Sequence, residues 1–108
     1  MNPIGSFAEW MDISGRESEL LLFVKTTNCS VCDGLYPQVE ALKADYPIPF
    51  YTVNAADVPE MAGQLALFTA PVVLLFKDGK EYARLARFVQ MAELKKRLGE
   101  LVERGNNS

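Results

Sequence analysis

Histidine is absent from the 108-residue sequence. This absence excludes Ser–His and Cys–His nucleophile pairs, imidazole metal sites and every mechanism that uses histidine as an acid or base. Basic residues are also few, because 11 lysines and arginines stand against 14 aspartates and glutamates, which gives a net charge of −3. Binding to nucleic acid irrespective of its sequence requires a basic face that neutralises phosphates, so we expect no nucleic-acid partner.

Long apolar runs are missing as well. No run reaches the roughly 18 residues needed to span a bilayer, and residues 1–5 have neither the basic nor the apolar part of a signal peptide. We therefore expect no membrane partner and a cytoplasmic location, where thiols are mostly reduced.

A hydrophobic fraction of 49% excludes a largely disordered chain. The length is that of a single domain, which we expect to comprise residues 1–108. We also expect the protein to be a monomer.

The hydrophobic pattern predicts a mixed sheet between two layers of helices. Helical periodicity or capping signals occur at residues 6–13, 29–46, 58–67 and 91–103, and short apolar or alternating runs typical of strands occur at 20–24, 48–53, 72–76 and 81–85. Asp78-Gly79, between the last two runs, is a hairpin turn signal. Alternating helices and strands followed by a hairpin indicate an α/β fold. We expect the polar tail, residues 104–108, to fray.

Both cysteines lie in one C-x-x-C motif, Cys29-Ser30-Val31-Cys32, where a buried strand is followed by a helix. The first turn of a helix has unpaired N–H groups and the positive end of the helix dipole, so a thiolate at Cys29 is stabilised there. Cys32 lies three residues further on, on the same helix face and deeper, and this spacing allows a disulfide within one turn. We therefore expect Cys29 to be the exposed nucleophile and Cys32 the sheltered resolving thiol.

Two other uses of a cysteine pair fit the sequence less well. A structural zinc site needs four ligands, and one chain offers a single C-x-x-C motif and no histidine, although a dimer that shares two pairs could bind the ion. A purely structural disulfide would close a very small loop and constrain the denatured state little. We therefore expect redox chemistry without a metal or another cofactor.

With its C-x-x-C motif between a buried strand and a helix, the chain resembles the thioredoxin family from about Leu20 to Val102. The matching segments are LLLFVKTTNCSVC, LYPQVEAL, VNAADVPEMAGQL and TAPVVLLFKDGK, followed by the last amphipathic helix. Pro37, five residues after Cys32, and Ala70-Pro71, at the start of the third strand, make the resemblance specific. It implies a thioredoxin-like fold, with a central mixed sheet flanked by helices on both faces. We expect four strands, or five if a first strand fits before Ser6.

The resemblance also implies which residues contact substrate. In the family, the proline at the position of Pro71 follows a cis peptide bond and faces the disulfide, and the main chain at the position of Ala70 pairs with a bound peptide. Asn28, Ser30 and Val31 surround the cysteines, and we expect them to contact substrate as well.

Five positions depart from the family's pattern. The Gly-Pro that is usual between the cysteines is Ser30-Val31, and the common tryptophan before the first cysteine is Asn28. A buried aspartate and the lysine that pairs with it are replaced by Phe23 and Thr52. Losing both members of the pair together is physically coherent, because one buried charge alone would be costly.

The resemblance implies a thiol–disulfide oxidoreductase. Its substrate would be a disulfide-containing protein or a small thiol, and a separate reductase would supply the electrons. The alternatives are a thioredoxin-like peptide-binding module and a redox sensor, both with little turnover. We expect a slow resolving step, because Phe23 cannot accept the proton of Cys32 and the Asp33 side chain should point away around the helix.

Overall fold

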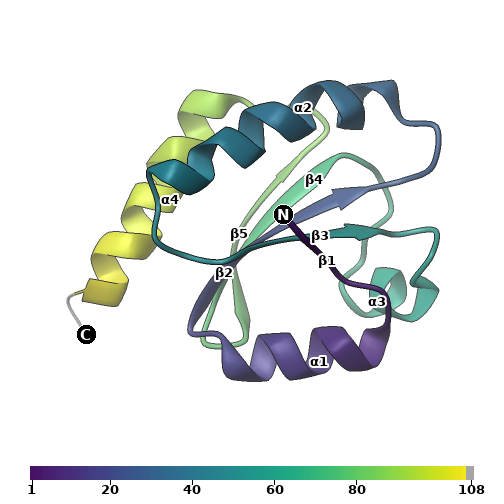
Figure 1. Ribbon diagram of the computed structural model, residues 1–108, viewed down its shortest axis with the longest axis horizontal. Coiled ribbons are helices and arrows are strands. Elements are labelled where there is room, and N and C mark those ends of the chain that lie inside the picture. Colours follow the sequence, from purple (N-terminus) through teal and green to yellow (C-terminus); the bar gives the residue numbers. More distant parts are fainter. Residues whose placement is uncertain (107–108) are drawn as a thin grey trace.

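The computed structural model describes residues 1–106. Its centre is a five-stranded sheet in the order β1-β3-β2-β4-β5, with helices on both sides (Figure 1). The strands are β1 (Asn2–Pro3), β2 (Glu19–Lys25), β3 (Phe50–Asn54), β4 (Val72–Lys77) and β5 (Lys80–Ala86). The helices are α1 (Phe7–Arg16), α2 (Ser30–Ala41), α3 (Pro59–Gln64) and α4 (Met91–Asn106), and the short 3-10 helix η1 (Leu42–Ala44) follows α2. Strands β1, β3 and β2 are parallel, whereas β4 and β5 are added antiparallel, so the sheet is mixed as predicted.

The fifth strand of the sheet is β1, which is only two residues long. Asn2 lies opposite Tyr51 and Pro3 opposite Thr52 in parallel register. The N–H of Ile4 continues the pairing by donating to the carbonyl oxygen of Thr52 over 2.8 Å. Proline is tolerated here because an edge strand leaves one side of its backbone unpaired. A first strand therefore does fit before Ser6, and the sheet has the larger of the two expected strand numbers.

The sheet is covered on both faces, because side chains along β2 alternate between two apolar clusters. The cluster on the side of α2 and α4 includes Leu21, Phe23, Leu35, Val39, Leu94 and Leu98. The cluster on the side of α1 and α3 includes Leu20, Leu22, Val24, Trp10, Ile13 and Met61. This is the two-sided burial that an unbroken apolar run predicts for a central strand.

Helix α1 begins where the sequence predicts and ends later. The Ser6 side chain caps it by accepting a hydrogen bond from the N–H of Glu9 over 3.1 Å. The helix continues beyond residue 13, the end of the predicted range, as far as Arg16. Arg16 pairs with Asp12 one turn earlier, over 2.7 Å, and this contact supports the last turn.

The ends of the other helices also differ from expectation. The helix predicted for residues 29–46 is divided, because α2 ends at Ala41 and η1 follows it. Helix α3 begins at Pro59 and ends at Gln64, inside the predicted range 58–67, and Val58 at its N-cap makes no side-chain hydrogen bond. Helix α4 extends through Asn106, so residues 104–106 of the tail expected to fray are helical, and residues 107–108 lie outside the described part. No helix within residues 1–106 is long and apolar enough to cross a membrane.

Candidate active site

The cysteine motif lies where the central strand β2 is followed by α2. Between them, Asn28 adopts a left-handed backbone conformation with φ of 58°, which asparagine tolerates better than most residues. Cys29 then occupies the N-cap of α2 in an extended conformation. The buried strand therefore holds one end of the motif and the helix N-terminus holds the other.

Cys29 and Cys32 form a disulfide, and their Cα atoms are 5.2 Å apart. The Sγ atom of Cys29 also accepts a hydrogen bond from the N–H of Cys32 over 3.1 Å, so this sulfur takes the place of a capping side chain. Cys29 is half-buried, whereas Cys32 is only 1% exposed. One sulfur of the pair is thus reachable from solvent and the other is sheltered.

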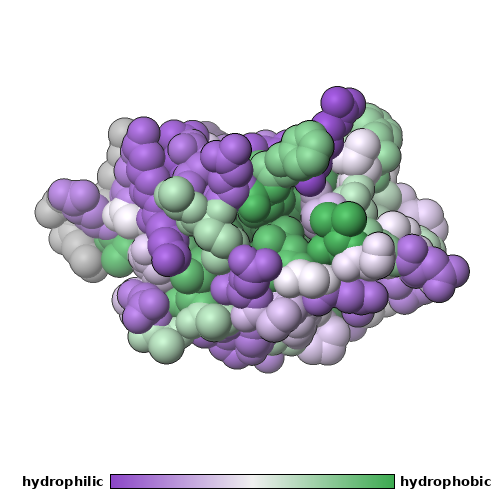
Figure 2. All heavy atoms as spheres, turned by 90° about the horizontal axis from the view of Figure 1, so that it is seen from above, coloured by the Kyte–Doolittle hydropathy of each residue, from purple (hydrophilic) through white to green (hydrophobic). Residues whose placement is uncertain are grey.

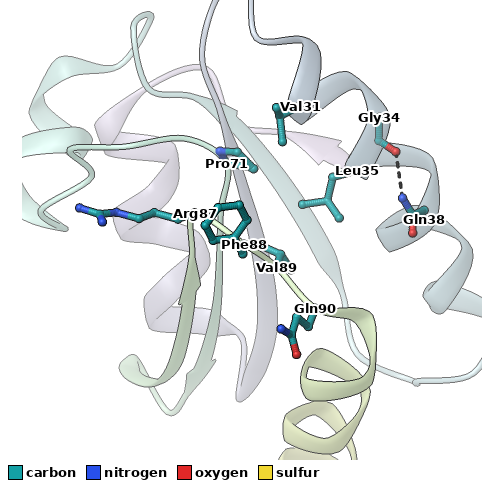
Figure 3. A pocket seen from close by; sticks show the side chains of 9 residues that line it. All are labelled: Val31, Gly34, Leu35, Gln38, Pro71, Arg87, Phe88, Val89 and Gln90. Carbon is teal, nitrogen blue, oxygen red and sulfur yellow. Dashed lines mark hydrogen bonds between the residues drawn. The ribbon is translucent and has the colours of Figure 1, made fainter.

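A groove of about 610 Å³ runs beside the motif. Val31 and Leu35 line it from α2, and Pro71 lines it from the loop before β4. They face Phe88 and Val89, which lie on the segment that connects β5 to α4 (Figure 3). The peptide bond between Ala70 and Pro71 is cis. Three segments that are far apart in the sequence therefore meet next to the disulfide.

The groove is bordered by apolar side chains that face solvent. Phe88 is 88% exposed and Val31 is 62% exposed. Apolar side chains gather across the middle of the face that carries α2 and α4, with hydrophilic side chains around them (Figure 2). Such exposed apolar surface is typical of a site that contacts a partner or ligand.

The segment at residues 87–90 belongs to the site without any pattern in its sequence that predicts this role. This connection has no hydrophobic periodicity and no motif, and Arg87 adopts a left-handed conformation with φ of 67°. The one available signal was Phe88 itself, because a large aromatic side chain in a short connection is unusual. The remaining predicted site residues, Asn28, Ser30 and Val31, are all exposed around the cysteines, and Ala70 is half-buried.

A second, smaller pocket of about 220 Å³ lies on the side of Cys32. We name it the Cys32 pocket, and its lining consists of Cys32, Lys25, Asp33 and Tyr36. Asp33 directly follows Cys32 in the first turn of α2, and both residues line this pocket.

The positions of the missing charge pair are filled without charge. Phe23 is fully buried, and its ring meets the ring of Tyr36 edge-on, with centroids 5.5 Å apart. The hydroxyl of Thr52 donates a hydrogen bond to the carbonyl oxygen of Phe23 over 3.1 Å. These two positions therefore hold an aromatic ring and a hydroxyl whose hydrogen bond is satisfied, and neither offers a carboxylate.

The ionisable groups with shifted pKa values on α2 belong to the docking of the N-terminus. The amino group of Met1 donates hydrogen bonds to the Glu40 carboxylate and the Tyr36 hydroxyl. The bond from this amino group, followed by one from Lys43, lowers the pKa of Glu40. Burial, followed by the charge of Glu40, raises the pKa of Tyr36. Tyr36 is therefore a neutral phenol at the edge of the Cys32 pocket near neutral pH.

Comparison with known proteins identifies this arrangement. Residues 7–100 match the Thioredoxin family. A thioredoxin-like protein of Bacillus subtilis, YdfQ, is 40% identical over 78 residues, which cover 71% of this chain and 70% of that protein. Thioredoxin AMT13 of Alternaria alternata is 32% identical over 79 residues, which cover 71% of this chain and 67% of that protein.

Solved structures show the same fold at lower sequence identity. The thioredoxin of Fasciola hepatica superposes with a TM-score of 0.84 at 22% identity, over 94% of this chain and 99% of that one. The oxidised form of mitochondrial thioredoxin 3 from Saccharomyces cerevisiae also gives 0.84, at 20% identity, over 94% of this chain and 95% of that one. The chain therefore belongs to the thioredoxin family, and with Cys29 and Cys32 in disulfide contact it is a thiol–disulfide oxidoreductase.

Proposed function

We propose that this chain reduces disulfides with Cys29 as the nucleophile and Cys32 as the resolving thiol. The observation that carries this assignment is the contrast between the two sulfurs. Cys29 is half-buried at the N-cap of α2, where an N–H group points at its sulfur, while Cys32 is almost fully buried. A helix N-terminus stabilises a thiolate, and the thiolate is the attacking species.

The reaction then proceeds in two exchanges. The Cys29 thiolate attacks one sulfur of the substrate disulfide, which forms a mixed disulfide and releases the other substrate sulfur as a thiolate. The Cys32 thiolate next attacks the Sγ atom of Cys29, which breaks the mixed disulfide and releases the second substrate sulfur. Two electrons have then moved to the substrate, and the chain holds the Cys29–Cys32 disulfide present in the structure.

The substrate in this proposal is an extended peptide segment that carries the disulfide. It lies beside Ala70 and Pro71, with Asn28, Ser30 and Val31 around the reacting sulfur. The exposed ring of Phe88 and the apolar floor of the groove support a peptide substrate, since they offer surface that a small thiol would not cover. The apolar groove gives the contact area and the sulfur pair gives the chemistry.

The remaining partners follow from what the chain itself contains. A separate reductase returns the disulfide to the dithiol, because the cysteine pair is the redox group of the site. We place this cycle in the cytoplasm and assign it to a monomer that forms one domain over residues 1–108. The net charge of −3 supports neither nucleic acid nor an anionic membrane surface as a partner.

A covalent trap tests this function. In the Cys32→Ser variant the second exchange cannot occur, so a disulfide-bonded peptide should stay attached to Cys29 in a stoichiometric, reducible adduct that peptide mass spectrometry locates. The matched Cys29→Ser variant should form no such adduct. An adduct on Cys32 in that variant, at a rate similar to that of the Cys32→Ser trap, would refute the assignment of roles.

A further inference from the structure

Lys25 lies at the same pocket as Cys32, at the end of the central strand. Side chains alternate along β2, and Phe23 belongs to the cluster on the side of α2. Lys25, two residues further on, therefore lies on the same side, at the end of the strand beneath the start of α2. There it lines the Cys32 pocket together with Cys32 itself.

The ammonium group of Lys25 has no anionic partner within residues 1–103, whose side chains the structure describes. It forms neither a hydrogen bond nor an ion pair, although its side chain is half-buried. Asp33 lines the same pocket and does not pair with it within 4.0 Å. A partly desolvated positive charge without a partner favours an anion that forms nearby. The thiolate of Cys32 is such an anion.

The other groups around Cys32 do not supply this positive charge. Asp33, the neighbour of Cys32 on α2, has a charge that opposes a thiolate. Tyr36, also on α2, contributes a phenol, whose ring meets the apolar ring of Phe23 edge-on. Lys25 is therefore the one cation among the residues that line the Cys32 pocket in the described part of the chain.

We propose that Lys25 stabilises the Cys32 thiolate during the second exchange, from the rim of the Cys32 pocket. This proposal rests on the proposed function and concerns its resolving step. Cys32 gives its proton to water that enters the pocket, and its electron pair then forms the bond to the Sγ atom of Cys29. The bond between Cys29 and the substrate sulfur breaks, and the departing thiolate takes up a proton from solvent. Lys25 keeps its own proton throughout and acts on Cys32 through its charge.

The decay of the mixed disulfide at Cys29 tests this role, because its dependence on pH reports the ionisation of Cys32. Reduced full-length protein is mixed with a disulfide-bonded peptide, and rapid acid quench follows the adduct over time between about pH 6 and pH 10. An opposite charge at ~4–6 Å shifts the pKa of a group by roughly one to three units toward its charged form, and solvent at a half-exposed site reduces this shift. We expect Lys25→Met to slow decay about three- to tenfold at neutral pH.

The same variant should shift the midpoint of the pH profile upward by about half to one unit and leave the alkaline plateau unchanged. Lys25→Arg should retain the wild-type profile, because it keeps the charge. Lys25→Gln provides a second neutral variant if the methionine lowers stability. High salt should reduce the difference between Lys25→Met and wild type, since the interaction reaches solvent.

Two further variants separate this role from its alternatives. Lys77 is a half-buried lysine at the end of β4, paired in register with Glu19 at the opposite end of β2. Lys77→Met should therefore leave the pH profile of decay unchanged. Asp33→Asn should accelerate decay at neutral pH, because it removes the opposing charge.

Two results would overturn the inference. One is a wild-type pH profile in both neutral Lys25 variants. The other is an Asp33→Asn variant that slows decay as much as Lys25→Met does, which would make Asp33 the proton acceptor. Failure of the proposed function has a different signature, because the Cys32→Ser variant would then form no adduct at Cys29.

Discussion

The two cysteines differ in access although they lie within one helical turn. In the reduced protein, a small alkylating reagent at neutral pH should modify Cys29 well before Cys32, because Cys29 is half-buried at the helix N-cap and Cys32 is 1% exposed. Peptide mass spectrometry of samples quenched at increasing times measures both rates. Equal labelling, or faster labelling of Cys32, would contradict the assignment of the nucleophile.

Phe88 is the residue that most clearly links the groove to substrate. Phe88→Ala should weaken the binding of a peptide disulfide by about 1 to 2 kcal/mol, which is roughly a five- to thirtyfold higher KM. The stability of the protein should change by less than about 0.5 kcal/mol, because the ring is 88% exposed. Steady-state kinetics and urea unfolding measure the two effects separately.

Met11 provides the matched control for Phe88. It is 57% exposed on α1, on the face of the sheet opposite α2 and α4, so Met11→Ala should change neither KM nor stability appreciably. An unchanged KM in Phe88→Ala, or an equal change in both variants, would remove Phe88 from the substrate site.

At the scale of the elements, β1 shows how a very short strand becomes part of the sheet. Ile4, which follows it, is 4% exposed and donates its N–H to Thr52. Ile4→Ala should lower the free energy of unfolding by about 2–4 kcal/mol, through lost burial and the cavity left behind. Urea unfolding measures this loss, and the exposed Asn2→Ala variant is the control. A loss below about 0.5 kcal/mol in Ile4→Ala would mean that the first strand does not dock as described.

The docking of the N-terminus on α2 should depend on pH through Glu40. Its pKa is lowered in the folded state, first by the hydrogen bond from the Met1 amino group and then by Lys43. A lowered pKa stabilises the fold at pH values above the pKa of the unfolded chain, and this stability is lost as the pH falls through the folded-state pKa. Glu40→Gln should therefore lower the urea midpoint at pH 7 and have a smaller effect near pH 3.

Asp45→Asn is the control for this titration, because Asp45 is exposed and forms no ion pair with the side chains of residues 1–103. It should not reproduce the pH-dependent loss. A Glu40→Gln effect of the same size at both pH values would show that the carboxylate charge is not what stabilises this contact.

The sequence predicts the elements of this fold better than their ends. The apolar runs in β2 and β4 identify central strands because both sides of each strand are buried. The hairpin is predicted equally well from its Asp-Gly turn. Asp78 and Gly79 both adopt positive φ, 50° and 79°, as the turn requires. Strand β1 cannot be predicted from the sequence, because two exposed residues show no hydrophobic pattern and form a strand only through pairing with β3.

At the scale of the whole molecule, the site depends on tertiary placement that local patterns do not contain. The cysteine motif was predictable because both cysteines and the start of the helix that follows lie within a few consecutive residues. Phe88 and Lys25 were not identified, because each reaches its pocket through the topology of the sheet: one follows β5, and the other ends β2.

If this chain transfers electrons to disulfides through Cys29 and Cys32, it must turn over a peptide disulfide. The reduction of a peptide disulfide is followed with a small dithiol as electron donor, at protein concentrations far below that of the peptide. Wild type should complete many turnovers above the background of the dithiol, and Cys29→Ser should fall to that background. A Cys29→Ser variant that turns over as fast as wild type, or a wild type that adds nothing to the background, would contradict this account.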